Sequence, residues 1–257
     1  MKFLLEWHPA VSIIILCIIS ISVSYFGIRL VRKRYSADML RENHEAGGFI
    51  FNAFGLIYAV LIAFVVFVTW TEYDGSLKNV DSEASELADL INDSKAFPED
   101  QRVQALQLIE EYMGNVKDDE WPLLSDGQVS EKARSSFHRL WDLYTSVDAA
   151  KLKNMPLYQE SLKHLNDLSE KRRTRIFDSR NDIPGVIWAV LLLGGILMVV
   201  YTFFFSMKKL AAQFLMTAAL ASIVTIILYM IYILDHPFVG YTKITTESFE
   251  YVLVLLK

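Results

Sequence analysis

The sequence predicts an all-α integral membrane protein, with four transmembrane helices arranged as two hairpins and a soluble helical insert between the second and third. Four long apolar runs contain no Asp, Glu, Lys or Arg, namely residues 10–28, 49–70, 183–205 and 210–234. At about 1.5 Å rise per residue, the last three can each cross a hydrocarbon core about 30 Å thick. The charged stretch between the second and third runs cannot enter lipid, and its apolar residues recur at helical rather than strand spacing.

The first span is expected at about residues 10–31. Its apolar run follows Lys2 and could be a secretory signal, but it is longer than the apolar core of a typical signal peptide. A stop-transfer cluster follows directly and favours a retained span: Arg29, Arg32, Lys33 and Arg34. The single Cys17 lies inside this run, so no intramolecular disulfide can form.

The second span is expected at about residues 49–70 and should continue out of the bilayer as one long helix. An apolar stripe of the insert begins about three turns beyond Trp70, and Gly75 is the only strong helix-weakening residue in 71–78. The span and the first helix of the insert are therefore predicted to be a single rod.

The second hairpin is expected to comprise spans at about residues 183–206 and 210–234. Asp182 and Pro184 are predicted to be the cap and the first turn of the third span, since short acidic side chains and proline favour helix N-termini. The predicted domains are thus a first hairpin in 1–70, the insert in 71–182, and the second hairpin with a C-terminal tail in 183–257.

The insert is predicted to contain four helices. The first carries a stripe at three- and four-residue steps, formed by Val80, Ala84, Leu87, Leu90 and Ile91. The second should begin after Pro98 and continue the pattern with Val103, Leu106, Ile109, Tyr112, Met113 and Val116. Glu120-Trp121-Pro122 is expected to break it, and further helices should begin near Ser130 and Pro156.

No catalytic or cofactor-binding motif accompanies this architecture. The histidines lack a second His or Cys at metal-ligand spacing: His8, His44, His138, His164 and His236. No cofactor or metal is expected, and the chain is predicted not to be an enzyme. A formal net charge of -5 without a broad basic face excludes a nucleic-acid partner.

The predicted spans also lack an ionisable residue in their interior. Proton- and ion-coupled transporters usually place Asp, Glu, His or Lys at depth, whereas only Asn52, Gln213 and hydroxyl groups enter the bilayer here. This composition disfavours an active transporter. It permits a passive channel, whose pathway would use apolar constrictions and amide or hydroxyl dipoles, and equally permits no conduction.

Two segments carry more specific information. A strip of small or polar residues recurs at helical steps in the second span, formed by Gly48, Asn52, Gly55 and Ala59. Such a strip allows another helix to approach closely, although ordinary packing within the chain also explains it. The last span ends in a turn-rich motif that contains Asp235, His236, Pro237, Phe238 and Gly240.

Together these segments resemble the bestrophin-like family of membrane proteins, over about residues 43–249. The resemblance rests on three groups of residues: Asn52, Gly55 and 64–73 with Trp70; Glu83 with Glu120-Trp121; and the basic stretch 173–180, Pro184, Trp188 and 234–240.

Bestrophins are pentameric ion channels, mostly anion-selective, with a hydrophobic neck formed by the second span and a helical cytosolic domain. The resemblance implies a homo-oligomer, with a pore lined by Gly48, Asn52, Leu56 and Ala59 and with inorganic ions as partners. Gly48 and Asn52 replace bulky neck side chains, so a tight apolar gate would need Leu56 or Ile57.

The motif at the end of the last span resembles the turn that opens the bestrophin calcium clasp. Residues 241–246 read Tyr-Thr-Lys-Ile-Thr-Thr and replace the acidic run that completes that clasp. Because calcium prefers six to eight oxygen ligands, Glu247 alone cannot build the site, and no calcium binding is predicted.

Basic residues flanking the spans do not decide the orientation. Seven fall on one side: Arg29, Arg32, Lys33, Arg34, Arg41, Lys208 and Lys209. Eight fall on the other: Lys2, Lys78, Lys171, Arg172, Arg173, Arg175, Arg180 and Lys243. The positive-inside rule therefore gives no answer. The resemblance instead implies a multi-pass protein of the cytoplasmic (inner) membrane, with the insert and both termini in the cytosol.

The leading hypothesis is a passive oligomeric ion channel that assembles in the lipid bilayer, with the pore along the second spans. The alternative is a membrane-anchored sensor or scaffold whose insert binds a protein partner. Asn52→Leu should alter conduction, whereas Asp235→Ala and Pro237→Ala should perturb folding where the last span ends.

Overall fold

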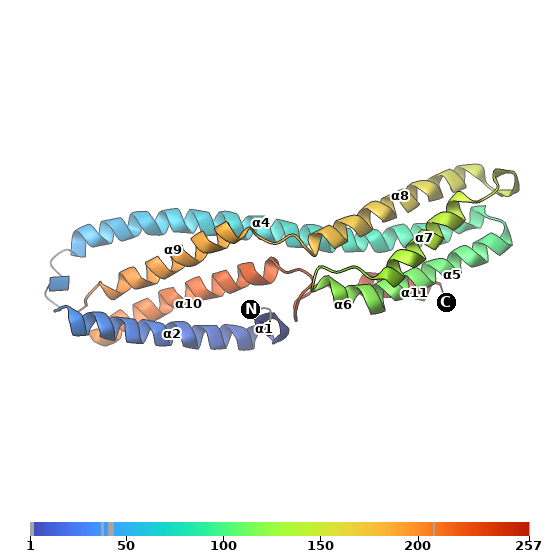
Figure 1. Cartoon of the computed structure of the whole chain (residues 1–257). Helices are drawn as coiled ribbons and strands as arrows, with labels where there is room; N and C mark the ends of the chain where they lie inside the picture. Colours follow the sequence, from blue (N-terminus) through green and yellow to red (C-terminus); the bar gives the residue numbers. More distant parts are fainter. Residues whose placement is uncertain (1–2, 37–38, 41–43, 208, 257) are drawn as a thin grey trace. The chain divides into compact units, whose positions relative to one another are not determined.

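The computed structural model describes residues 3–36, 39–40, 44–207 and 209–256, and all regular elements in those ranges are helical (Figure 1). Four helices, α2, α4, α9 and α10, are long and apolar enough to cross a membrane. The predicted all-α membrane fold is confirmed. The chain divides into two compact units: Met1–Glu72, Asp182–Asp235 and Gly240–Thr242 form the membrane unit, and Tyr73–Asn181, His236–Val239 and Lys243–Lys257 form the helical unit.

The membrane unit contains the apolar helices and a short N-terminal turn. Its elements are α1 (Phe3–Glu6), α2 (Pro9–Arg34), residues 44–72 of α4 (His44–Asp93), α9 (Gly185–Phe203) and α10 (Leu210–Leu234). Helix α10 packs against α2 and α9, and α2 also packs against α9 (Figure 1). The Arg32 guanidinium donates to Gln213 Oε1 at 2.6 Å and to the Met207 carbonyl at 2.8 Å, which ties the end of α2 to the start of α10.

Helix α4 is a single helix of 50 residues, so the predicted continuous rod is confirmed. Gly75 does not interrupt it, since an exposed helical glycine weakens a helix by only about 1 kcal/mol relative to alanine. In the membrane unit Tyr58 and Val65 are buried, and in the helical unit Val80 and Leu87 are buried.

The described residues of the helical unit form one hydrophobic core. Its longer elements are residues 73–93 of α4, α5 (Glu99–Asn115), α7 (Glu131–Thr145), α8 (Met155–Asp178) and α11 (Glu247–Leu255). Short elements join them: η1 (Ser94–Ala96), the π-helical η2 (Val116–Glu120), α6 (Trp121–Leu124) and η3 (Ala149–Lys151). Ser130 caps α7 by accepting from the Ala133 N–H, and Asn154 caps α8 by accepting from the Leu157 N–H.

Two expectations for the insert were wrong. The chain does not break at Glu120-Trp121-Pro122 but stays helical through η2 and α6. Pro122 lies in the first turn of α6, where its missing N–H is not needed by the helix. Val103 is 47% exposed and does not belong to the buried stripe of α5.

The start of the third span also differs from the prediction. Pro184 has an extended backbone and is the N-cap of α9, which begins at Gly185 and ends at Phe203. Asp182 provides no recorded cap; instead the Ile183 N–H donates to Asp235. The fourth span, at 210–234, matches α10 to the residue.

The C-terminal tail packs within the helical unit, although the sequence grouped it with the second hairpin. Phe249 and Val252 are buried in the core of this unit, and α11 contacts α5. The nine residues of α11 gave no separate signal because so short a helix shows little periodicity.

Candidate functional site

One side of α4 packs against the other membrane helices. Tyr58, Val65 and Thr69 are buried, and the Tyr58 hydroxyl donates to the Leu191 carbonyl of α9 at 2.8 Å. The Thr69 hydroxyl donates to the Val65 carbonyl within its own helix, so the polar atom does not need an outside partner. This side is therefore fixed by contacts inside one chain.

A notch in α9 accepts the Tyr58 ring. A Cβ added at Gly194 would lie 2.5 Å from the Tyr58 ring, and one at Gly195 would lie 2.9 Å from its hydroxyl. Both glycines are needed because any side chain there would push α4 away. Two adjacent glycines within a span are a sequence signal of close helix approach, but such a signal does not identify the partner ring.

Replacing Tyr58 with phenylalanine should weaken this contact without emptying the notch. We expect the free energy of unfolding to fall by about 0.5–1.5 kcal/mol, the usual net value of one hydrogen bond. Thermal unfolding of the detergent-solubilised protein measures this. Tyr25→Phe is the control, because the Tyr25 side chain is exposed. Equal effects of the two changes would contradict the role of the hydroxyl.

A second side of α4 is not covered by the chain itself. Asn52, Leu56 and Ala59 are exposed, Leu56 at 68%, and a Cβ at Gly48 would meet no atom within 4 Å. Asn52 makes no recorded hydrogen bond to any described residue. We call Gly48, Asn52, Leu56 and Ala59 the α4 strip.

Gly55 does not share this uncovered surface. A Cβ at Gly55 would lie 3.4 Å from Met198 Cε, so this position faces α9 of the same chain. The strip of small or polar residues in the sequence therefore belongs to two different surfaces of α4. Gly55 serves packing within the chain, whereas Asn52 and Ala59 are exposed and Gly48 is partly exposed.

Asp235 closes the α9–α10 hairpin at the end of the last span. It is 5% exposed, and its two carboxylate oxygens accept from the Ile183 N–H at 2.7 Å and from Trp188 Nε1 at 3.0 Å. One side chain therefore satisfies the backbone before α9 and the indole in its first turn. The sequence placed Asp235 in a structural motif but did not indicate these partners.

The rest of the motif makes two separate turns. In the helical unit the Pro237 carbonyl accepts from the Ile244 N–H at 2.8 Å, and Phe238 packs edge-on against Trp121. In the membrane unit Gly240 has φ +83, and a Cβ there would lie 2.2 Å from the Leu5 carbonyl oxygen. Only glycine fits that conformation and that contact.

The helical unit contains a buried ion network that the sequence did not predict. Arg175 Nε donates to Glu83 Oε2 at 2.6 Å and its Nη2 donates to Glu120 Oε1 at 2.8 Å, and all three side chains have 0% exposure. Arg172 donates to the other Glu120 oxygen at 2.7 Å, and the Tyr112 hydroxyl donates to Glu83 at 2.9 Å. The network joins α4, α5, η2 and α8.

Electrostatics fixes the charge state of this network. Burial alone lowers the pKa of Arg175, but the charge and hydrogen bond of Glu83 raise that pKa well above its usual value. Burial, and then the Glu83 charge, raise the pKa of the Tyr112 hydroxyl, so it stays a donor. Because these side chains have no exposed surface, a substrate cannot reach them, and we assign the network a structural role.

The described residues bring one mixed donor group together. One donor atom from each of Glu86, Asp89 and His164 lies within 4.8 Å of the others, and Asp93 Oδ2 is 2.8 Å from His164 Nδ1. Surface carboxylates commonly gather in this way without a metal ion. We therefore assign no metal site to the group.

Known proteins share this architecture. A family model for the bestrophin-like domain matches residues 14–249. Two crystal structures of a bacterial bestrophin homologue from Klebsiella pneumoniae superpose with TM-scores of 0.73 and 0.74 at 10% identity, over 95% of this chain and 97% of the other. A crystal structure described as a membrane protein superposes with a TM-score of 0.73 at 11% identity, over 95% and 97% of the two chains.

At this level of identity the structural matches establish the fold. No curated protein matches the chain at the sequence level. The family model covers more than half of the chain, and the four apolar helices fit it. The chain is a member of the bestrophin-like family.

Proposed function

We propose that the protein is a passive ion channel that assembles as a homo-oligomer, with the α4 strip lining the pore. The observation that carries the proposal is Asn52, an exposed amide in an apolar helix with no recorded partner among the described residues. An amide turned toward acyl chains is unfavourable, whereas one that lines a water-filled path is solvated. Four spans cannot enclose a wide pore, so the path requires several copies.

The coverage of the spans supports the same arrangement. Only 11% of the apolar window of α4 is buried within the chain, against 33% for α10. Copies of α4 around a common axis would cover part of this exposed surface. The family resemblance implies five copies in a bacterial-type inner membrane, with the insert and both termini on its cytosolic side.

Leu56 is our candidate for the apolar constriction. At 3.6 residues per turn it lies about 40° around the helix from Asn52, whereas Ile57 lies about 140° away. A ring of Leu56 side chains, one turn below a ring of Asn52 amides, would form a hydrophobic gate next to a polar mouth.

Flux through liposomes tests the proposal. Purified protein should release chloride or sodium, and Asn52→Leu should lower the rate by roughly 5- to 30-fold, because loss of an ion–amide contact raises the barrier by about 1–2 kcal/mol. The assembly should stay intact by mass photometry. Ala53→Leu is the matched control, since its exposed side chain lies about 100° further around α4.

Three results would argue against the proposal. Absence of chloride and sodium flux over a range of pH and voltage would remove the channel function. Wild-type flux in Asn52→Leu would leave a channel but reject the α4 strip as its lining. A subunit count of one would also reject it, because one copy has no axial path.

A further inference from the structure

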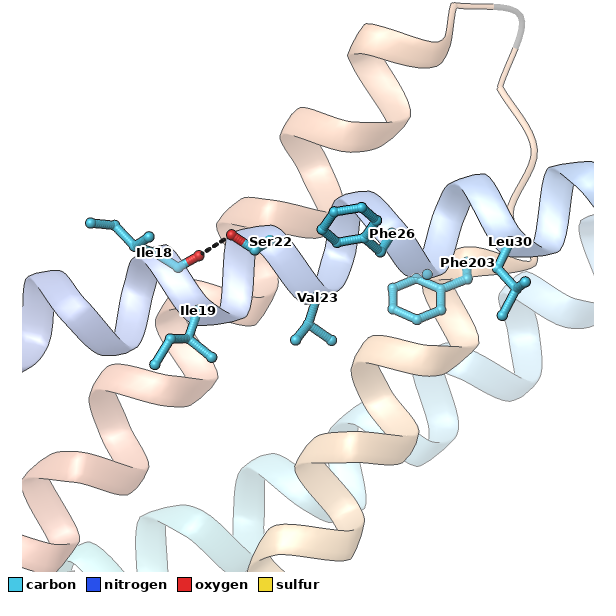
Figure 2. Close-up of a pocket in the computed structure, with 8 residues that line it drawn as sticks. Ile18, Ile19, Ser22, Val23, Phe26, Leu30 and Phe203 are labelled. Atoms are coloured by element: carbon cyan, nitrogen blue, oxygen red, sulfur yellow. Dashed lines mark hydrogen bonds between the residues drawn. The ribbon is translucent and has the colours of Figure 1, made fainter.

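An apolar groove lies between α2 and the end of α9 in the membrane unit (Figure 2). The groove has a volume of about 500 Å³ and is largely open rather than enclosed. Ser22 is the only hydroxyl-bearing residue in its lining, and its hydroxyl donates to the Ile18 carbonyl at 2.7 Å. The groove therefore presents carbon atoms and a polar group that is already satisfied.

Gly27 creates the floor of the groove. A Cβ at Gly27 would lie 2.3 Å from the Phe203 ring, so the missing side chain lets this ring lie directly against α2. In Figure 2, Ile19, Val23 and Leu30 point to the same side of α2 as the Phe203 ring. Leu30 is 71% exposed and forms a wall of the groove that no described residue covers.

The length of the groove matches one leaflet of a bilayer. From Ile18 to Leu30 helix α2 rises about 18 Å, at 1.5 Å per residue. Half of a hydrocarbon core is about 15 Å thick. A single acyl chain lying along α2 would therefore fill the groove from the middle of the membrane to its surface.

Two basic side chains continue one edge of the groove, the edge formed by Ile18, Ser22 and Phe26. The series Ile18, Ser22, Phe26, Arg29 and Lys33 advances by three or four residues, so these side chains share one face. Arg29 and Lys33 are exposed, and neither forms a recorded ion pair with a described residue. Arg29 lies over the Tyr25 ring at 5.0 Å, and aromatic side chains near the end of a span favour the headgroup level.

We propose that this groove binds one acyl chain of an anionic phospholipid, whose phosphate is held by Arg29 and Lys33. Lipid tails are as apolar as the groove, so the acyl chain positions the lipid but gives little selectivity. The selectivity comes from the two cations, because each basic residue near the surface attracts anionic headgroups. The leaflet is the one at which α2 ends and α4 begins.

Native mass spectrometry of the full-length protein tests the proposal. Phosphatidylglycerol and phosphatidylcholine with identical acyl chains are the probes. We expect phosphatidylglycerol to bind about 30-fold more tightly, a ratio that corresponds to about 2 kcal/mol. The double change Arg29→Gln with Lys33→Gln should remove this preference and leave phosphatidylcholine binding unchanged. Arg173→Gln, an exposed cation of α8, is the control for charge and should leave the preference intact.

A second variant distinguishes the contribution of the groove to lipid binding from that of the two cations. Ser22→Phe fills the centre of the groove and should lower the affinity for both lipids by a similar factor. Ile14→Phe, at an exposed site on α2 outside the lining, should change neither affinity. Equal affinity of the two lipids would overturn the proposal, and so would full competition by inorganic phosphate. Disulfide cross-linking between copies through Ser22→Cys, in a Cys17→Ser background, would show that a second copy covers the groove and would also overturn it.

Discussion

Arg175→Met is expected to lower the free energy of unfolding by about 3–5 kcal/mol, the usual effect of removing one partner of a buried ion pair. Arg175 has no exposed surface, and its guanidinium holds Glu83 and Glu120 at hydrogen-bond distance. Without it, Glu83 keeps only the Tyr112 hydroxyl as a recorded partner. A carboxylate at 0% exposure would then stay buried without a counter-charge, because methionine is apolar and uncharged.

Chemical unfolding of the purified protein, followed by circular dichroism, measures the effect. The double variant Glu83→Gln with Arg175→Met should recover part of the loss, because a neutral amide is less costly to bury than a carboxylate. Arg134→Met is the control, since Arg134 pairs with Glu131 at the surface and such pairs contribute about 0–1 kcal/mol. A loss for Arg175→Met no larger than that of Arg134→Met would contradict a stabilising role for the network.

The network shows where prediction from sequence ends. The family resemblance rested in part on Glu83, on Glu120 and on the basic stretch 173–180, which contains Arg175, but it did not indicate that these residues pair. Arg175 lies 92 and 55 positions away from Glu83 and Glu120 along the chain. No local pattern encodes such distances. The π-helical turn at Val116–Glu120, which contains Glu120, also gave no periodic signal because it adds a residue to the helical repeat.

The membrane spans were predictable for a physical reason. A helix that spans a bilayer needs about twenty consecutive, predominantly apolar residues, and such a run can be recognised in the sequence without any knowledge of tertiary contacts. Helix α10 accordingly matches its prediction to the residue, whereas α9 starts late because Pro184 is extended. The N-terminal side of α9 depends on Asp235, which is distant in sequence, so its boundary was less predictable.

The α4 strip was only partly predictable. Helical spacing placed Gly48, Asn52, Gly55 and Ala59 on one side, but small residues favour any close neighbour, within the chain or in another copy. The contact of Gly55 with Met198 depends on how α9 is positioned, which spacing in α4 cannot reveal. Pore lining by the remaining residues stays a prediction, to be decided by the Asn52→Leu flux measurement.

Asp235→Ala should be the second large effect, and we expect it to lower the free energy of unfolding by about 2–6 kcal/mol. Two donors lose their acceptor at once, the Ile183 N–H and the Trp188 indole. A buried donor left unpaired costs about 1–3 kcal/mol, and the lower part of this range applies because both hydrogen bonds are only part-buried. Asp235→Asn should lose roughly half as much, because its single carbonyl oxygen can accept from one of the two donors.

Pro237→Ala gives the matching comparison on the adjacent turn. Its hydrogen bond with Ile244 uses the backbone carbonyl, which alanine retains, so the loss should be only about 0.4–1 kcal/mol through greater freedom of the unfolded chain. Thermal unfolding, together with the accessibility of Trp188 to a fluorescence quencher, measures the series. Asp235→Ala should expose Trp188 while Pro237→Ala should not. Equal stability losses with an unchanged Trp188 would mean that the turn, rather than the carboxylate, holds the start of α9.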